Sequence, residues 1–293
     1  MRLDRYKFER RCELKIIDRV AKVYSLGSVK HLQALHNGKT SAAWQVETMN
    51  DRYIVKTIQS QKQAVFEFAV SNAVRHKSLE LTPEILLSIA CQPFVVIEGQ
   101  TYQVQAFLSG TERPPSLRET LKSYRQMRQV LDQFDYSFSP PDSRPLVALW
   151  RTHRETLSEK KPVLFHQIAA MVPELKRIDQ SRDAWIHGDL GKWNLLVTNS
   201  GQVVVIDFGE ARLGPKLLDF AALFQGFMPK NKQDLTAYLN EFLALSGIQI
   251  TDRHLFLMTV QLWLVKGLLI VINEQASLAG VFQNAIELVS SLV

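Results

Sequence analysis

Two polar loops joined by an apolar hairpin pattern constrain this 293-residue chain more than any other feature of its sequence. The first loop carries Asp189, and Asn194 follows five residues later. Residues 195–197 and 203–206 are apolar and are separated by turn-forming residues, which predicts the two strands of a β-hairpin. Asp207 ends the second strand. The pattern therefore places a carboxylate, an amide and a second carboxylate on two short loops of one hairpin.

These three side chains suit magnesium-assisted phosphoryl transfer. Asp189 is the candidate catalytic base, because a loop beside a rigid strand can hold a carboxylate within hydrogen-bond reach of an acceptor hydroxyl. Asn194 and Asp207 are the candidate metal ligands, since Mg²⁺ accepts both amide and carboxylate oxygens. Each residue alone is more often an ordinary turn residue, and only the joint spacing favours the catalytic interpretation.

The sequence resembles the kinase-like phosphotransferases, specifically their aminoglycoside phosphotransferase and choline kinase branch. The resemblance rests on His-Gly-Asp-Leu-x-x-x-Asn at 187–194, Ile-Asp-Phe-Gly at 206–209 and Gly-Pro-x-x-x-Asp-Phe-Ala at 214–221. It implies an α+β, bilobal protein-kinase-like fold. We therefore expect a small antiparallel β N-lobe over residues 1–108 and a larger, mainly helical C-lobe over residues 109–293.

The resemblance also implies a role for each residue of the motifs. Asp189 looks like the catalytic base, while Asn194 and Asp207 look like the ligands of Mg²⁺. Asp219 would accept backbone N–H groups of the loop that carries Asp189. His187 would support this loop rather than transfer protons.

Nucleotide binding would fall to the N-lobe, with ATP as the co-substrate. Lys56 lies on an alternating strand and would contact the α- and β-phosphates. Its acidic partner is most simply Glu67, eleven residues on, although Glu80 is a second candidate. Gly38 lies where a phosphate-covering loop would be, but its Asn-Gly pair equally suits a plain hairpin turn. Backbone groups of Ala106 and Leu108 are expected to contact the adenine; together these residues are Lys56, Glu67, Gly38, Ala106 and Leu108.

The rest of the sequence gives the order of the elements. In the N-lobe we expect strands at 29–35, 43–48 and 53–58, a helix at 60–75, and a hairpin of 93–98 with 101–108 around a Gly99-Gln100 turn. In the C-lobe, Ser116 and Glu119 form a capping box that begins a helix. Two further helical patterns cover 146–157 and 163–178, and the apolar run 254–272 is expected to be a buried helix rather than a membrane span.

The composition narrows the function classes. The first 30 residues hold nine basic and four acidic side chains, a net charge of +5, yet no nucleic-acid motif accompanies them. We interpret this segment as a helix whose solvated face is basic and whose other face packs on the protein through Leu14, Ile17, Ala21 and Tyr24. The sequence contains only two cysteines and predicts no disulfide framework, so a reducing cytoplasm is the expected compartment.

Two features separate a small-molecule kinase from a protein kinase. Gly188 stands where protein kinases keep an arginine that pairs with a phosphorylated activation loop. Only nine residues separate Gly209 from Asp219, which is too few for a segment that displays a peptide. The acceptor is therefore expected to be a small hydroxylated molecule. Few carboxylates follow residue 222, which argues against a polycation. Five aromatic residues could cage a choline-like cation or be ordinary core: Trp185, Trp193, Trp263, Phe224 and Phe227.

Two functional hypotheses follow. The first is an ATP- and Mg-dependent kinase that phosphorylates a hydroxyl of a small molecule, with no membrane or nucleic-acid partner. The alternative is a kinase-like binding or assembly protein, for example of the spore-coat-associated type, with little or no catalysis. Because Lys56, Asp189, Asn194 and Asp207 are all present, the sequence favours the enzyme. Nothing in the sequence indicates the oligomeric state.

Overall fold

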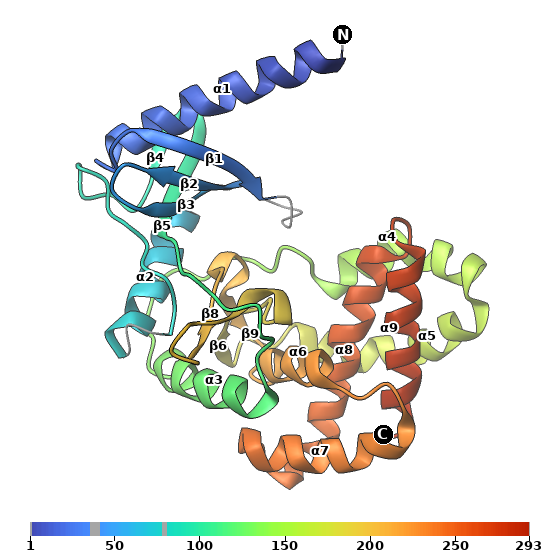
Figure 1. The fold of residues 1–293 in the computed structure, drawn as a ribbon. Coiled ribbons are helices and arrows are strands. Elements are labelled where there is room, and N and C mark those ends of the chain that lie inside the picture. The colour runs from blue at the N-terminus through green and yellow to red at the C-terminus, as the bar shows by residue number, and fades with distance from the viewer. Residues whose placement is uncertain (1, 36–41, 78–80, 293) are drawn as a thin grey trace. The chain divides into compact units, whose positions relative to one another are not determined.

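The computed structural model describes residues 2–35, 42–77 and 81–292, with side chains from residue 13 onward. The chain forms two compact units (Figure 1). The first consists of Met1–Pro114 and Leu196–Gly209, and the second of Pro115–Leu195 and Glu210–Val293. The first unit thus contains the predicted N-lobe, residues 1–108, together with the segment that carries Asp207.

A five-stranded antiparallel sheet forms the centre of the first unit. Its strand order is β1-β2-β3-β5-β4, so the hairpin β4–β5 joins the sheet through β5. Helix α2 (Gln61–Lys77) lies between β3 and β5 in the sequence, as predicted. The strands are β1 (Val29–Leu35), β2 (Ala43–Thr48), β3 (Arg52–Ile58), β4 (Val95–Ile97) and β5 (Gln100–Ala106).

The β4–β5 turn lies one residue earlier than the sequence analysis placed it. Ile97 pairs with Gln100, so the two turn residues are Glu98 and Gly99 rather than Gly99 and Gln100. Both have positive φ, +53° and +80°. A two-residue turn of this hand matches the twist of the strands, and glycine at its second position removes one of the two steric penalties.

Helix α1 (Arg2–Val23) packs on the sheet through its last turns. Ile17, Ala21 and Tyr24 are buried in the same cluster as the sheet residues Val46 and Val104, which confirms three of the four predicted contacts. The fourth was wrong, because the Leu14 side chain is 40% exposed. Among the α1 side chains from residue 13 onward, Ile17 is the first that is fully buried against the sheet.

The second segment of the first unit is the predicted hairpin. It consists of β7 (Leu195–Val197) and β8 (Val203–Val205). Within this unit, the amide of Thr111 donates to the carbonyl of Val197, and the amide of Val205 donates to the carbonyl of Leu81. These hydrogen bonds fix the strand that leads directly to Asp207.

The second unit is mainly helical. The capping box is present at its first helix: the Ser116 hydroxyl accepts the Glu119 amide, and the Glu119 carboxylate accepts the Ser116 amide. A short antiparallel pair consists of β6 (Ala184–Ile186) and β9 (Arg212–Gly214), and β6 leads directly into the motif at 187–194. The helices are α3 (Leu117–Leu131), α4 (Leu146–Lys160), α5 (Pro162–Asp179), α6 (Leu218–Phe227), α7 (Lys232–Ser246), α8 (Arg253–Val271) and α9 (Ala276–Ser290), with the short 3-10 turns η1 (Lys192–Asn194), η2 (Phe208–Glu210) and η3 (Ile250–Asp252).

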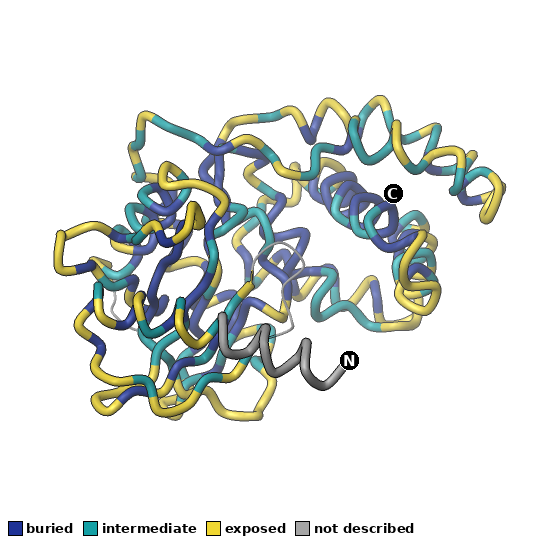
Figure 2. Tube along the Cα trace, turned by 90° about the horizontal axis from the view of Figure 1, so that it is seen from above, coloured by how far each residue is buried: buried dark blue, intermediate teal, exposed yellow. Residues whose placement is uncertain are grey.

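Helix α8 is the core helix of the second unit. The segment Ile250–Val271 has the length and mean hydropathy of a membrane span, but 72% of its most apolar window is buried inside the protein. Phe256 of this helix packs with the rings of Phe224 and Phe242, and the three ring centroids are 5.2 to 5.5 Å apart. Buried residues lie mainly in the interior of each unit, whereas loops and the outer faces of helices hold most of the exposed residues (Figure 2).

Candidate active site

A buried ion pair joins β3 to α2 in the first unit. Lys56 Nζ donates to Glu67 Oε2 over 2.7 Å, and the two side chains are only 8% and 3% exposed. The predicted pairing of Lys56 with Glu67 is therefore present, despite the short sequence gap. The other candidate, Glu80, lies outside the described residues.

Asp207 is the third member of this cluster. Lys56 Nζ also lies 3.1 Å from Asp207 Oδ1, and the Asp207 side chain is 52% exposed. The backbone of Asp207 has φ +63°, a left-handed conformation that non-glycine residues rarely adopt. Such strain persists only where surrounding contacts hold it, and it is often found at functional sites. The geometry turns the carboxylate toward Lys56 while half of the side chain stays accessible.

Electrostatics keep Lys56 charged. Burial alone would lower its pKa, but the nearby carboxylates of Asp207 and Glu67 outweigh this effect and raise the pKa above its usual range. The lysine is therefore a permanent cation in an interior position. Such a charge suits the binding of phosphate oxygens.

Gln63, which was not predicted from the sequence, also belongs to this cluster. Its side-chain amide donates to Glu67 Oε1 over 3.3 Å and to the backbone carbonyl of Gly209 over 3.0 Å. Gln63 thus orients the glutamate and ties α2 to the turn after Asp207. Its position four residues before Glu67, on the same helix face, was the available signal.

Three further residues were predicted to contact the nucleotide, and the structure describes two of them, Ala106 and Leu108. Gly38 lies outside the described residues. Ala106 ends β5, and its amide donates to the carbonyl of Glu84 over 2.8 Å. Leu108 follows two residues later in a partly buried, irregular segment. Adenine contacts at Ala106 and Leu108 stay a prediction.

In the second unit, Asp219 holds the loop that carries Asp189. Its carboxylate accepts the amide of His187 over 2.8 Å and the amide of Gly188 over 2.9 Å. The Tyr124 hydroxyl donates to the same carboxylate over 3.1 Å. Asp219 is 1% exposed, so these hydrogen bonds form in a buried environment. The predicted structural role of Asp219 is confirmed.

His187 is completely buried beneath this loop. Its Nδ1 lies 3.4 Å from the amide nitrogen of Asp189, at the distance of a long hydrogen bond. A ring without solvent access, placed against the loop backbone, fits the predicted supporting role better than proton transfer.

Asp189 and Asn194 are neighbours in the second unit. The Asn194 amide nitrogen donates to the Asp189 carbonyl over 2.7 Å and lies 3.3 Å from Asp189 Oδ2. Trp193 Nε1 donates to the same carboxylate oxygen over 3.3 Å, a contact that the sequence analysis did not foresee. The second oxygen, Oδ1, accepts no hydrogen bond from any residue within the described ranges. Those residues therefore leave the hydrogen-bonding capacity of this oxygen unused.

The pKa of Asp189 is raised from its ordinary value. Burial is the main cause, and Glu210 adds to it, while His187, the Trp193 hydrogen bond and Arg144 act in the opposite direction. A carboxylate with a raised pKa is a stronger proton acceptor than an ordinary aspartate.

The donor set decides which cation would fit. Across residues 13–35, 42–77 and 81–292, no three His, Cys, Asp or Glu side chains come together as a complete metal cage. Asp207 offers a half-exposed carboxylate, and the hydrogen bonds of the Asn194 amide nitrogen leave its oxygen as the available ligand atom. Each of these oxygens, taken by itself, is of a kind that Mg²⁺ accepts, and Mg²⁺ is usually bound by few protein groups together with nucleotide phosphates.

Two of the five predicted aromatic residues belong to the core, as the alternative interpretation expected. Trp185 and Phe224 are buried core residues, at 9% and 0% exposure. Trp193, in contrast, is 60% exposed beside Asp189. Lys192 lies with its Nζ 4.2 Å from the centre of the Phe227 ring, which places a cation where a choline-like group would need a free ring face.

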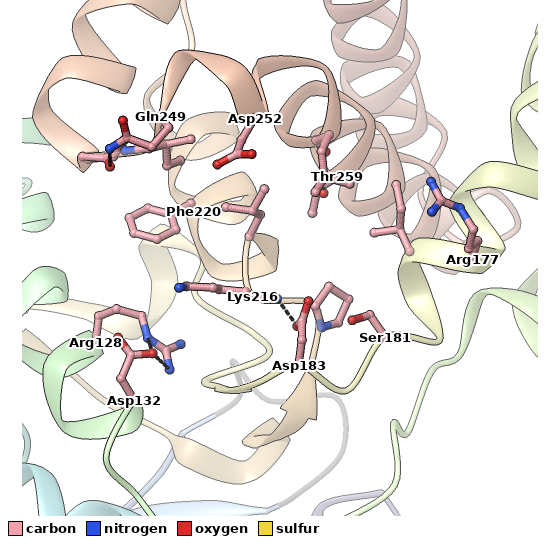
Figure 3. A pocket seen from close by; sticks show the side chains of 17 residues that line it. Arg128, Asp132, Arg177, Ser181, Asp183, Lys216, Phe220, Gln249, Asp252 and Thr259 are labelled. Atoms are coloured by element: carbon pink, nitrogen blue, oxygen red, sulfur yellow. Dashed lines mark hydrogen bonds and ion pairs between the residues drawn. The ribbon is translucent and has the colours of Figure 1, made fainter.

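The second unit also contains a cavity of about 620 Å³. Figure 3 shows Phe220, Lys216 and Arg128 around it, with Arg128 paired to Asp132 and the Lys216 amide bonded to Asp183. None of the predicted site residues lines it. Its cationic and acidic side chains are balanced, so its lining selects no ligand charge.

A family model described as the phosphotransferase enzyme family matches residues 31–254. A comparison with curated proteins gives no match. An aminoglycoside phosphotransferase from Alicyclobacillus acidocaldarius has a similar crystal structure, with a TM-score of 0.63 at 17% identity over 92% of this chain and 91% of that chain.

Other similar structures were determined with ligands. A spectinomycin phosphotransferase in complex with ADP and spectinomycin gives a TM-score of 0.66 at 15% identity, covering 94% of this chain and 97% of that chain. A related protein in complex with GDP and kanamycin gives 0.64 at 13% identity, covering 95% and 99%. These similarities confirm the predicted fold class, with its small antiparallel sheet and mainly helical C-terminal part, and the family-model match confirms the resemblance on which it was based.

Proposed function

The chain belongs to the phosphotransferase enzyme family, and we propose that it transfers the γ-phosphate of ATP to a hydroxyl group of a small molecule, with Mg²⁺ as cofactor. The observation that carries this proposal is the Lys56, Glu67 and Asp207 cluster. Within one unit, it combines a permanently charged lysine with a half-exposed carboxylate on a residue whose backbone is strained. An interior arrangement of this kind is costly for stability and suits phosphate and metal binding.

Lys56 would bind the α- and β-phosphates, held in place by Glu67. The adenine would contact the backbone of Ala106 and Leu108, and Gly38 would approach the phosphates. Asp207 and Asn194 would hold Mg²⁺. The ion, when bound, supplies positive charge that offsets the charge developing on the phosphate oxygens.

Asp189 would act as the catalytic base. The acceptor oxygen attacks the γ-phosphorus, its O–H proton passes to Asp189 Oδ1, and the bond from the γ-phosphorus to the leaving oxygen of ADP breaks. Two observations support this assignment: the described residues donate no hydrogen bond to Oδ1, and burial raises the pKa of the carboxylate. Trp193 and Asn194 hold the other oxygen and so fix the carboxylate in one orientation.

The charge of the side chains near Asp189 indicates which class of acceptor the protein would bind. The similar structures include complexes with spectinomycin, kanamycin and hygromycin B. In this chain Lys192 lies three residues after Asp189 over the Phe227 ring. A cation at this position disfavours a polycationic acceptor. We therefore expect a neutral or anionic hydroxylated metabolite, phosphorylated in the cytoplasm without a membrane or nucleic-acid partner.

The test is acceptor-dependent release of ADP from ATP and Mg²⁺ with pooled hydroxylated metabolites. Asp189→Asn should lower turnover by about 10³-fold while Mg-nucleotide binding, measured by calorimetry, stays unchanged. Asp207→Ala should weaken that binding by about tenfold or more. Asp135→Asn, an exposed carboxylate on a loop, is the matched control and should behave like the wild type.

Two results would count against the proposal. Full turnover in Asp189→Asn would remove this residue from the base role. Absence of Mg-nucleotide binding in the wild type would favour the alternative, a kinase-like binding or assembly protein.

A further inference from the structure

The guanidinium of Arg212 fills the space beside the α-carbon of Gly188. A Cβ at position 188 would come 2.3 Å from Arg212 Nη1 and 2.3 Å from the Glu210 carbonyl, closer than real contacts allow. Gly188 also has φ +82°, which favours glycine. Arg212 Nη1 donates to the same Glu210 carbonyl over 3.0 Å. The residue before the candidate base is therefore packed directly against a buried arginine from β9.

Arg212 belongs to a buried network of four side chains whose charges alternate in sign. Its Nη2 lies 3.2 Å from Asp142 Oδ2, which also lies 2.8 Å from Lys266 Nζ. Lys266 in turn lies 2.8 Å from Asp179 Oδ1. The four side chains are 3% to 10% exposed and sum to zero charge. This network of side chains connects four parts of the second unit: β9, the loop before α4, helix α8 and the end of α5.

A second set of contacts joins the same two segments. Glu210 Oε2 accepts the Ser143 hydroxyl over 2.6 Å, and Arg144 lies 3.3 Å from Glu210 Oε1. Residues 142–144 are thus attached to residues 210–212 through two carboxylates. Both Arg144 and Glu210 influence the pKa of Asp189, so this junction lies within electrostatic reach of the base.

Burying four charges has a large desolvation free energy, which makes them an unusual means of holding a loop. Moving each ion out of water costs several kcal/mol, and apolar residues of similar volume often replace such a network without loss of stability. Burial of Arg212 against Gly188 therefore calls for a reason other than stability. Asp219 already binds the amides of His187 and Gly188, and Arg212 supplies a separate contact at the Gly188 α-carbon.

We propose that Arg212, anchored by Asp142, is a positioning residue that sets the conformation of Gly188 and through it the place of the Asp189 carboxylate. The kinetic part of this inference rests on the proposed base role of Asp189. The conformational part does not, because it concerns the loop itself. No covalent modification is needed for this support, since Asp142 provides the counter-charge permanently.

Hydrogen exchange of the folded protein tests the conformational part. In Arg212→Met, a peptide spanning residues 184–195 should exchange about tenfold faster than in the wild type, because the contact at Gly188 is lost. Lys266→Met is the matched control. It breaks the same charge network at a site that does not touch the loop, so it should lower the melting temperature and leave exchange in this peptide unchanged.

ADP release tests the kinetic part. Arg212→Met should lower kcat by about 10²-fold, as expected for a misplaced catalytic group, with KM for ATP within about twofold. Arg212→Lys should recover part of kcat, because it restores the charge without the planar fork; it also serves if the methionine variant does not fold. Equal loop exchange in the Arg212 variants and the wild type, or an equal increase in Lys266→Met, overturns the inference. An unchanged kcat with a loosened loop overturns the kinetic part. Loss of nucleotide binding in the wild type would refute the proposed function and leave the exchange result valid.

Discussion

Lys56 and Glu67 are joined over 2.7 Å in the interior of the first unit, with more than nine-tenths of each side chain buried. A buried ion pair contributes little net stability, since both charges lose their hydration. Breaking it is different, because the remaining charge then has no partner at the same distance. Lys56 keeps Asp207 at 3.1 Å, but Asp207 is half exposed and only partly replaces the glutamate.

Replacing Glu67 should therefore destabilise the protein strongly. We expect Glu67→Ala to lower the free energy of unfolding by about 3 kcal/mol, measured by urea denaturation. Arg19→Ala is the control, because Arg19 and Glu98 form a 2.6 Å pair in the same unit with both side chains more than half exposed. That change should cost at most about 1 kcal/mol. Similar losses in the two variants would mean that burial does not govern the Lys56 pair.

Gly188→Ala tests the packing at the catalytic loop. Its Cβ would overlap Arg212 and the Glu210 carbonyl, so we expect a loss of more than about 3 kcal/mol in thermal or urea unfolding. Gly201→Ala is the control. Gly201 has φ +84°, almost the same as Gly188, but a Cβ at this position would have no atom within 4 Å. It should cost only the conformational penalty of about 1 to 2 kcal/mol. Equal losses would show that the overlap is relieved without cost.

The activity should depend on the ionisation of Asp189. Burial raises the pKa of this carboxylate, so kcat should fall, as the pH is lowered, at a higher pH than an ordinary aspartate would allow. Trp193→Phe removes an N–H donor that stabilises the charged form. The acid limb of the kcat profile, recorded over about pH 4 to 9, should therefore shift to higher pH in this variant. A shift to lower pH would mean that Trp193 does not donate to the base.

The same pKa makes a prediction about stability. Because the folded-state pKa of Asp189 lies above the unfolded value, the folded state binds the proton more tightly. The corresponding stability is present below the unfolded pKa and is lost as the pH rises through the folded pKa. Asp189→Asn should thus raise the melting temperature at neutral pH, and the gain should shrink in acid. A lower melting temperature at neutral pH would contradict the raised pKa.

Local signals in the sequence were sufficient for much of the fold. The predicted strands 29–35 and 43–48 match β1 and β2, and the Ser116 capping box begins α3 as expected. These features depend on residues close together in the chain. The two errors, at Leu14 and at the Glu98 turn, concern how far a helix or strand extends, which tertiary contacts decide.

The candidate site was only partly accessible from the sequence. Asp189 and Asn194 belong to a short motif, and their contact is local. Arg212, Asp142 and Lys266 carry no such signal, because Lys266 is 124 residues from its partner Asp142 and each residue alone is an ordinary charged side chain. Their association depends on the packing of α8 against the preceding helices. Spacing patterns do not encode that packing.

The polypeptide passes between the two units three times, after Pro114, Leu195 and Gly209. A fragment ending at Pro114 would therefore not be a whole folding unit. It would lack β8, whose Val205 amide bonds the Leu81 carbonyl, and it would lack the carboxylate that balances Lys56. If residues 1–114 are expressed alone, they should need a separate peptide covering 196–209 in order to fold. A chimera that takes the first unit from a related protein would likewise have to exchange residues 1–114 and 196–209 together.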